Sequence, residues 1–296
     1  METPTTQASS FTKAVVKAMN TLYPETLADT AWDNVGLLLG NTERSGQVQN
    51  TVLLTNDLTP EVADEAIKEK ASVIVSYHPF IFRGLKSITL DDPQQRTLLH
   101  LAQNNVAVYC PHTAVDAAPG GLNDWLADML EFDGIEASRS VAQPVSRPAP
   151  AGFEGSGYGR VLSYRAPVKV SQIAKKLATG LGGIRHVMMA LPRRASLETL
   201  EARSAAVCAG SGFDILSGCN ADVIVTGEMT HHHALKATME GRVVITVFHS
   251  NSEREFLAER MEPALLKLLQ SELGDVRVVV SKEDADPFFI MDVRDL

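Results

Sequence analysis

The segment ASVIVSYHP at residues 71–79 decides the fold class of this chain. It is an apolar run rich in β-branched residues, which is typical of a strand buried on both faces of a parallel sheet. A helical pattern over 60–69 precedes it, another over 93–104 follows it, and VAVYCPHTAVD (106–116) is a second apolar run. Strands that alternate with helices through short links predict an α/β fold with mostly parallel sheets.

The same alternation returns after residue 204, with buried-strand runs that include ADVIVTGE (221–228) and VVITVFH (243–249). Residues 137–160 are rich in Pro, Gly and Ser and lack periodicity, which predicts a linker. We therefore expect a two-lobed fold with helices flanking the sheets. Its predicted parts are a metal-binding α/β portion from 1–136 together with 204–296, the linker, and a small middle α/β unit at 161–203.

The composition is that of a globular protein with a net negative charge. The chain has 296 residues, 45% of them hydrophobic, and a formal charge of −9. This charge argues against general nucleic-acid binding, which needs a basic face, but allows a local basic pocket for one small anion. Cys110, Cys208 and Cys219 form no CxxC pair, which favours a reducing compartment over a disulfide framework.

The chain carries no apolar run of the ~20 residues that a membrane helix needs, and no signal peptide is evident. Its start, METPTTQASSFTK, is rich in Ser and Thr but has no Arg. We expect a cytoplasmic protein without membrane contact, and leave a mitochondrial or nuclear pool open.

Ionisable residues follow four of the apolar runs. These residues are His78, Asp116, Glu228 and His249. In open parallel sheets, ligands bind outside the carboxyl ends of the strands. If the four strands are neighbours, these side chains meet at one edge and predict a metal site there.

The segment after His249 strengthens this prediction because His249 and Glu253 are four residues apart at the entry to a helix and project from one face. Mixed nitrogen and oxygen ligands suit Zn, Mn, Fe or Co. Structural alternatives exist for each residue: a surface His–Glu contact, a strand-ending turn at His78-Pro79, and a helix cap at Asp116. His112 fits a role in supporting the ligands better than one in binding the metal.

Two further motifs are ambiguous. His231, His232 and His233 are consecutive, and successive helical residues point about 100° apart, so at most two can face one pocket. We take His231 as a pocket residue and His232, with Glu228, as a candidate for acid–base catalysis, against a solvated helix start. The glycine-rich CAGSG (208–212) predicts either a phosphate cradle or a tight strand-to-helix turn.

Six segments of the sequence, taken in order, form one ordered set of motifs. They are AWDNVGLLLG (31–40), SYHPFIFRGLKSI (76–88), CPHTAVDAAPGGLND (110–124), CAGSG (208–212), TGEMTHHHALKA (226–237) and FHSNSERE (248–255). This set resembles the NGG-interacting-factor-three-like family, also called the GTP cyclohydrolase 1 type 2 family. The resemblance runs from about residue 11 to 295 and is closest to the eukaryotic branch.

The resemblance implies a two-lobed α/β fold with a di-metal centre in a cleft. His78 matches the second histidine of the family's His-His-Pro motif, and Tyr77 stands where the first would be. Asp116 matches the bridging aspartate, and His249 with Glu253 match the C-terminal pair. Because Tyr77 replaces one histidine, the resemblance is compatible with either one or two metal ions per chain. Zinc is the ion expected first, with iron or manganese as alternatives.

The resemblance also implies two kinds of function. One is a metal-dependent hydrolase acting on a nucleotide or related small molecule, by the family label through attack on the GTP purine with release of formate. The other is a non-catalytic role as a partner of the transcription machinery or as a metal chaperone. Members form dimers or ring-like hexamers, so a homo-oligomer is expected.

Overall fold

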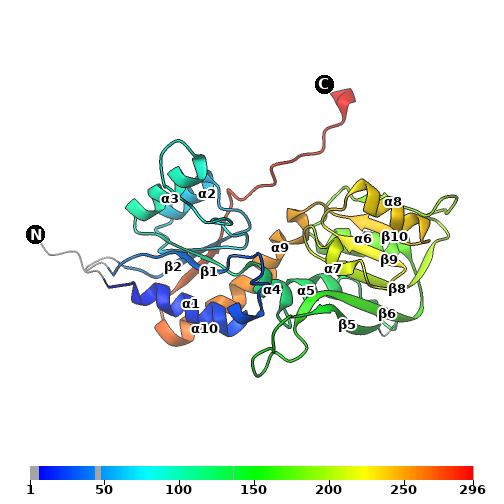
Figure 1. The fold of residues 1–296 in the computed structure, drawn as a ribbon, viewed down its shortest axis with the longest axis horizontal. Helices are drawn as coiled ribbons and strands as arrows, with labels where there is room; N and C mark the ends of the chain where they lie inside the picture. Colours follow the sequence, from blue (N-terminus) through cyan, green and yellow to red (C-terminus); the bar gives the residue numbers. More distant parts are fainter. Residues whose placement is uncertain (1–6, 44–47, 136, 296) are drawn as a thin grey trace, which may run out of the picture.

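The computed structural model describes residues 7–43, 48–135 and 137–295, which form two lobes that are each built on one sheet (Figure 1). The first sheet has the order β1-β4-β3-β2-β11. Its strands are β1 (Gly36–Leu39), β2 (Thr51–Thr55), β3 (Val73–Ser76), β4 (Ala107–Cys110) and β11 (Arg277–Val280). All neighbours pair in parallel except β1, which is antiparallel to β4.

The second sheet has the order β5-β6-β8-β9-β10-β7. It consists of β5 (Ala137–Pro144), β6 (Gly157–Lys169), β7 (Met188–Ala190), β8 (Glu201–Cys208), β9 (Val223–Thr226) and β10 (Val243–Thr246). Strands β8, β9 and β10 are parallel, whereas β5, β6 and β7 join by antiparallel pairing. The fold is therefore mixed α/β, with parallel strands in the middle of each sheet.

Helices cover both sheets and form the connections between the parallel strands. The α-helices are α1 (Ser10–Leu22), α2 (Pro60–Lys68), α3 (Pro93–Gln103), α4 (His112–Ala117), α5 (Leu122–Asp128), α6 (Val170–Gly180), α7 (Phe213–Leu216), α8 (His231–Met239), α9 (Arg254–Phe256) and α10 (Glu262–Leu273). Short 3-10 helices are η1 (Glu25–Leu27), η2 (Ser250–Ser252) and η4 (Val293–Asp295), and a π-helical segment η3 (Leu257–Met261) joins α9 to α10.

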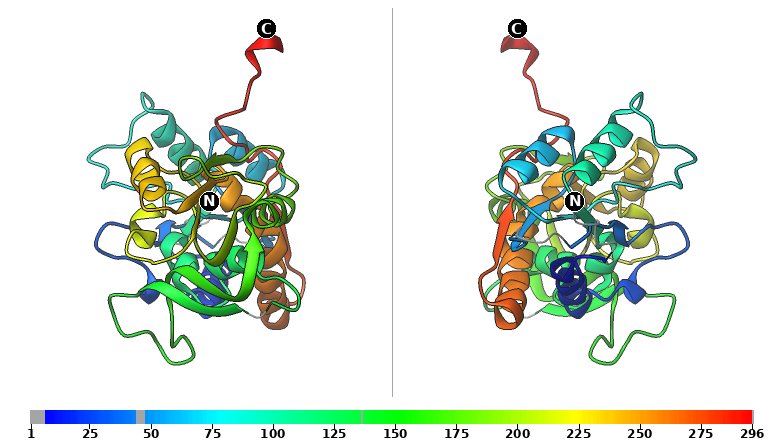
Figure 2. Two further views of the ribbon diagram at one scale, coloured as in Figure 1. Left: turned by 90° about the vertical axis from the view of Figure 1, so that its right-hand side faces the viewer. Right: turned by 90° about the vertical axis from the view of Figure 1, so that its left-hand side faces the viewer.

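Alternate residues of the first sheet pack against opposite helix layers. Leu53 and Ile74 belong to the cluster that contains the buried residues of α2 and α3. Val52 and Leu54 belong to the large core that contains those of α1 and α10. The side views place these two helix pairs on opposite faces of the sheet (Figure 2). Burial on both faces explains why these strands are continuous apolar runs rather than alternating ones.

The second lobe is built in the same way. Ile224 packs in a cluster with buried residues of α7 and α8, and its neighbour Val225 joins the core that includes α5 and α6.

No helix in the described parts of the chain has both the length and the apolar character needed to cross a bilayer.

Two predictions about segments differ from the structure. The strand expected at 106–116 ends at Cys110, and α4 begins at His112, so Asp116 lies inside a short helix. The linker expected at 137–160 contains β5 and the start of β6, and the strands of 161–203 share a sheet with β8, β9 and β10. Strand β5 is a partly exposed edge strand, so its sequence ASRSVAQP lacks the apolar pattern of a central strand.

Candidate metal centre

The carboxyl ends of the parallel strands from both sheets meet between the lobes. Asp57, His78 and His112 follow β2, β3 and β4 of the first sheet, and Glu228 and His249 follow β9 and β10 of the second. The His78 and His249 rings lie 5.3 Å apart. The sequence reasoning required these strands to be neighbours in one sheet, but they belong to two sheets. The site forms because the carboxyl ends of the two sheets face each other.

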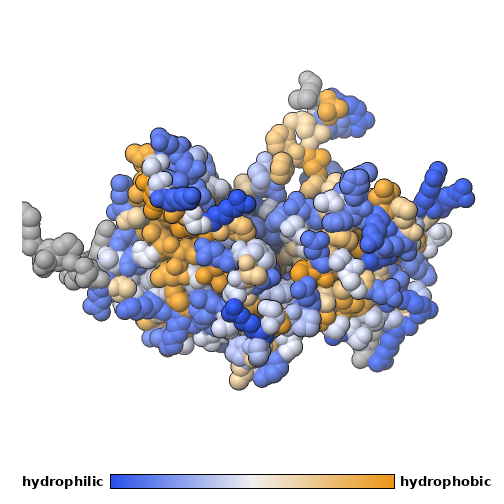
Figure 3. All heavy atoms as spheres, in the orientation of Figure 1, coloured by the Kyte–Doolittle hydropathy of each residue, from blue (hydrophilic) through white to orange (hydrophobic). Residues whose placement is uncertain are grey.

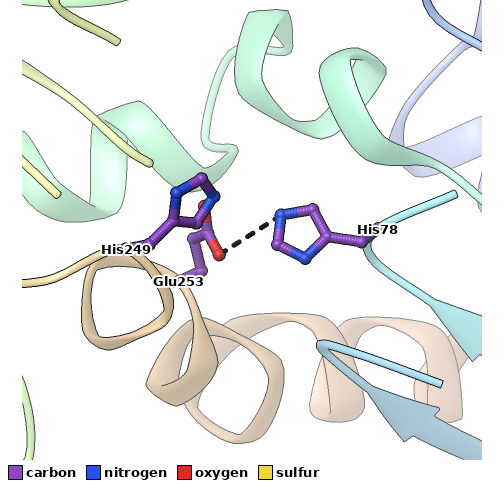
Figure 4. Close-up of side chains that lie close together, drawn as sticks. All are labelled: His78, His249 and Glu253. Atoms are coloured by element: carbon purple, nitrogen blue, oxygen red, sulfur yellow. Dashed lines mark ion pairs between the residues drawn. The ribbon is translucent and has the colours of Figure 1, made fainter. Parts of the chain in front are cut away.

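Three side chains converge at this junction. One ligand atom from each of His78, His249 and Glu253 lies within 4.8 Å of the others. His249 Nε2 is 3.3 Å from Glu253 Oε1, and His78 Nε2 is 3.6 Å from Glu253 Oε2. Figure 4 shows His78 reaching toward the Glu253 carboxylate from the opposite side to His249. The predicted i, i+4 pair is therefore completed by a histidine from the other lobe.

The other nitrogen of each imidazole is held by a carboxylate. His78 Nδ1 lies 2.9 Å from Asp57 Oδ1, and His249 Nδ1 lies 2.9 Å from Glu228 Oε1. A carboxylate on Nδ1 fixes the ring orientation and directs the lone pair of Nε2 toward the centre, as in metal-bound histidines. Sequence reasoning missed Asp57, although it follows the buried strand TVLLT in the same manner as His78 follows its own strand.

Glu253 is the buried member of the group. It is 2% exposed, and burial raises the pKa of its carboxyl well above the ordinary value, with the charges of Asp116 and Asp57 adding to the effect. The Asn56 amide donates a 3.1 Å hydrogen bond to Oε2 and acts in the opposite direction. A buried carboxylate facing two imidazole nitrogens is a donor set that fits a divalent ion such as Zn²⁺, Fe²⁺ or Mn²⁺.

Asp116 lies beside this group but has a different partner. Its Oδ1 accepts a 2.8 Å hydrogen bond from the Tyr77 hydroxyl. Burial raises the pKa of Asp116, and burial together with the Asp116 charge raises that of Tyr77 well above its usual range. The phenol therefore remains a donor. Asp116 is not among the three residues whose ligand atoms converge, in contrast to the bridging role that the resemblance implies.

His112 has the same kind of support as the other two histidines. Its Nδ1 lies 2.7 Å from Asp33 Oδ1, and the Thr113 amide donates to Asp33 Oδ2. The His112 ring is 5.5 Å from that of His78. Asp33 comes from the turn signal of AWDNVGLLLG, so this motif serves to orient a histidine at the centre, a role that the turn pattern alone did not indicate.

The CAGSG segment packs against the centre as a tight turn. Gly210 has φ +57°, and a Cβ there would lie 2.8 Å from Glu253 Oε1 and 3.0 Å from His249 Nε2. Its amide donates to Ser252 Oγ at 2.8 Å, and the Gly212 amide donates to the Ala209 carbonyl. Because these amides are already bonded within the protein, the turn interpretation fits this segment better than the phosphate cradle.

The three consecutive histidines begin α8. His231 and His232 are exposed, and His233 stacks on Phe213 with ring centroids 4.4 Å apart. None of the three is among the residues that line the cavity described next. The structure thus places Glu228 beside the centre and His232 away from it.

A cavity of about 860 Å³ adjoins the two histidines. His78, His249, Asp57 and Glu228 lie in its wall, together with residues from the connection before β7 and from the C-terminal segment. Phe248, which also lines it, has φ +70°, an uncommon conformation for a bulky residue that is found most often at functional sites.

The chain matches the model of the family Duf34/NIF3 (NGG1p interacting factor 3) over residues 11–287. It is 42% identical to the Protein NIF3 homolog of Schizosaccharomyces pombe and 38% identical to NGG1-interacting factor 3 of Saccharomyces cerevisiae; each match covers 93% of this chain and 96% of the relative. The NIF3-like protein 1 of Drosophila melanogaster is 39% identical, over 93% of this chain and 87% of that protein.

Solved structures share the fold at low identity. A Bacillus cereus protein related to NIF3 has a TM-score of 0.75 and 21% identity, with 94% of this chain and 98% of that chain covered. Reduced HcgD from Methanocaldococcus jannaschii has a TM-score of 0.68 and 20% identity, with 91% and 97% covered. The family match and the eukaryotic relatives agree over most of the chain, and the chain therefore belongs to the Duf34/NIF3 family.

Proposed function

We propose that this chain is a divalent-metal-dependent hydrolase that acts on a nucleotide or a related small molecule. The observation that carries the proposal is the buried carboxylate of Glu253 facing the Nε2 atoms of His78 and His249, two histidines that line a cavity large enough for a small molecule. These three residues would hold a divalent ion, which would supply Lewis-acid activation of a water molecule. Zinc is the ion we expect first, with iron or manganese as alternatives.

In this proposal, the chain's own residues have separate tasks. His78, His249 and Glu253 hold the ion, and Asp57 and Glu228 fix the orientation of the two imidazoles. The main task of Glu228 in this proposal is therefore to orient His249, and accepting a proton is secondary.

Proton transfer in this proposal falls to His112. Its ring lies 5.5 Å from that of His78, and Asp33 engages Nδ1, so Nε2 is the nitrogen that would take part. His232 receives no role because its exposed ring contacts that of His231 rather than a residue of the centre.

The second candidate is a protein-interaction role without catalysis. The S. cerevisiae relative is named as an interacting factor, and this chain is 38% identical to it. Tyr77 favours this candidate as well, because its hydroxyl engages Asp116 and so leaves fewer free ligands for a metal. Self-association into dimers or hexamers remains a prediction under either candidate.

Metal content of the purified chain tests the first proposal. We expect a divalent metal in the native protein by elemental analysis and its loss in Glu253→Ala and His249→Ala. His232→Ala, which removes an exposed imidazole, is the matched control and keeps its metal. Turnover of a nucleotide panel by the native protein but not by Glu253→Ala would support the hydrolase. Equal metal content in the native chain and both site variants would overturn the centre, and metal without turnover would favour the interaction role.

A further inference from the structure

Arg185 and His186 form one edge of the cavity beside the candidate metal centre. Both residues belong to the connection between α6 and β7, and both line the cavity that also contains His78 and His249. Their side chains are exposed, and neither has a hydrogen bond or an ion pair with another residue in the described parts of the chain. Exposed arginines are often unpaired, and the position of these two residues beside the centre sets them apart.

Strand pairing fixes that place. Strand β7 is antiparallel to β10, with Met188 opposite Thr246. Thr246 is the last residue of β10, three positions before His249. The residues that directly precede Met188 therefore lie at the end of the sheet where β10 delivers His249. Gly182 and Gly183, with φ of +77° and +76°, turn the chain from the end of α6 toward this edge.

The acidic residues of the cavity wall already have partners. Asp57 is bonded to His78, Glu228 to His249, and Asp286 to the Ser250 hydroxyl. The guanidinium of Arg185, in contrast, is permanently charged and presents a planar fork of donors that matches a phosphate or a carboxylate. Arg185 is thus the charged side chain of this wall that has no partner among the residues the structure describes.

The remaining wall is apolar and incomplete. Phe248, Phe288, Phe289 and Ile290 line the cavity, yet Phe288 is 84% and Phe289 77% exposed. The C-terminal segment that carries these residues is held by two hydrogen bonds that precede them. The Asn56 backbone amide donates to Asp284, and the Ser250 hydroxyl donates to Asp286. Beyond these contacts, the segment and its apolar residues project from the rest of the molecule (Figure 3). A flat apolar ligand would cover ring faces that the chain itself leaves open.

We propose that Arg185 and His186 bind the oxyanion of a small ligand whose aromatic body packs against Phe288 and Phe289, beside the metal centre. This inference rests on the proposed function, since it names the class of molecule that the centre acts on: an aromatic compound carrying a phosphate or a carboxylate.

Calorimetric titration of the metal-loaded chain with phenyl phosphate, benzoate and phenol tests the inference. We expect an anion to bind and the neutral phenol not to, and the preferred anion identifies the group. Arg185→Ala should weaken binding by about tenfold or more, since charge-assisted hydrogen bonds are the strong ones, and Arg185→Lys should restore part of it. Arg193→Ala is the matched control, because Arg193 is also exposed but does not line the cavity. Phe289→Ala should weaken phenyl phosphate more than inorganic phosphate.

Metal content measured on the same samples separates this inference from the proposed function. Normal metal in every variant with equal affinity in native, Arg185→Ala and Arg193→Ala would overturn the oxyanion site and leave the metal centre standing. No metal in the native chain would remove the proposed function, whereas loss of anion binding in Arg185→Ala alone would still support the subsite.

Discussion

The hydroxyl of Tyr77 donates a 2.8 Å hydrogen bond to Oδ1 of Asp116, so a neutral phenol occupies one oxygen of the carboxylate that the family resemblance assigns to metal bridging. The next residue, His78, faces Glu253. Two adjacent residues after β3 thus have different partners. Tyr77 is hydrogen-bonded to Asp116, whereas His78 belongs to the candidate metal centre.

Replacing Tyr77 with histidine should raise the metal content per chain. The change removes the competing donor from Asp116 and adds an imidazole where the family motif has one. Tyr77→Phe, which removes the hydroxyl without adding a ligand, should leave the content at the native level. Elemental analysis of the three proteins checks this. Equal content in native and Tyr77→His would show that Asp116 does not limit metal uptake.

Gly210→Ala should lower metal affinity as well as stability. A Cβ at this position would come within 2.8 Å of Glu253 Oε1 and would displace a ligand. Gly241→Ala is the control, because Gly241 has φ +82° but no atom within 4 Å of its Cβ. Both variants should lose about 1–2 kcal/mol through the left-handed backbone, but only Gly210→Ala should lose metal in an equilibrium dialysis. Loss of metal in both would contradict the steric argument.

Asp57→Asn and Glu228→Gln should each weaken metal binding by about 10–100-fold while the fold is retained, as expected for groups that orient ligating histidines. The amides keep the size of the side chains but lose the charge that holds Nδ1–H. Competition with a chelator measures the affinities, and circular dichroism checks the fold. Native affinity in both variants would mean that the carboxylates do not orient the rings.

Asp124 should make the free energy of unfolding decrease at acidic pH. Burial opposes its ionisation, but the hydrogen bonds and charge of Arg160 keep the pKa of Asp124 below the ordinary value. The pair is bidentate, at 2.7 and 2.8 Å, and Arg160 is 3% exposed. Because the folded-state pKa is lowered, the stabilisation is present above about pH 4 and is lost as the pH falls through the folded-state value.

Asp124→Asn should therefore cost about 3–5 kcal/mol at neutral pH, since it leaves a buried guanidinium without its charge partner. Asp128→Asn is the control, because its side chain is 43% exposed and its pairs lie at the surface. Urea unfolding at several pH values measures both. If Asp124→Asn kept the same pH dependence of unfolding as the native protein, Asp124 would be excluded as the source of that dependence.

The sequence predicted that three of the side chains converge, but it placed the boundaries of several elements wrongly. His78 and His249 could be found because both directly follow buried apolar strands, and Glu253 because it lies four residues after His249. Asp116 was misplaced within its element because VAVYCPHTAVD continues as an apolar stretch through a helix that begins at His112. Such a run does not reveal where a strand becomes a helix, since both are buried.

The division into lobes was harder to predict for a physical reason. Strand β5 is an edge strand whose residues are half-exposed, and β6 pairs with both β5 and β8. Edge strands have little apolar patterning, so ASRSVAQP resembles loop sequence. The meeting of the two sheets end to end is a long-range arrangement that no local pattern encodes.

The position of His78 on one lobe and of His249 on the other has a thermodynamic consequence. An ion that bonds to both is a crosslink between bodies that are otherwise joined by packing and by the chain itself. By linkage, such an ion would stabilise the folded chain by RT ln(1 + [ion]/Kd) relative to an unfolded chain that lacks the site. The free energy of unfolding of both lobes would then depend on the concentration of free cation.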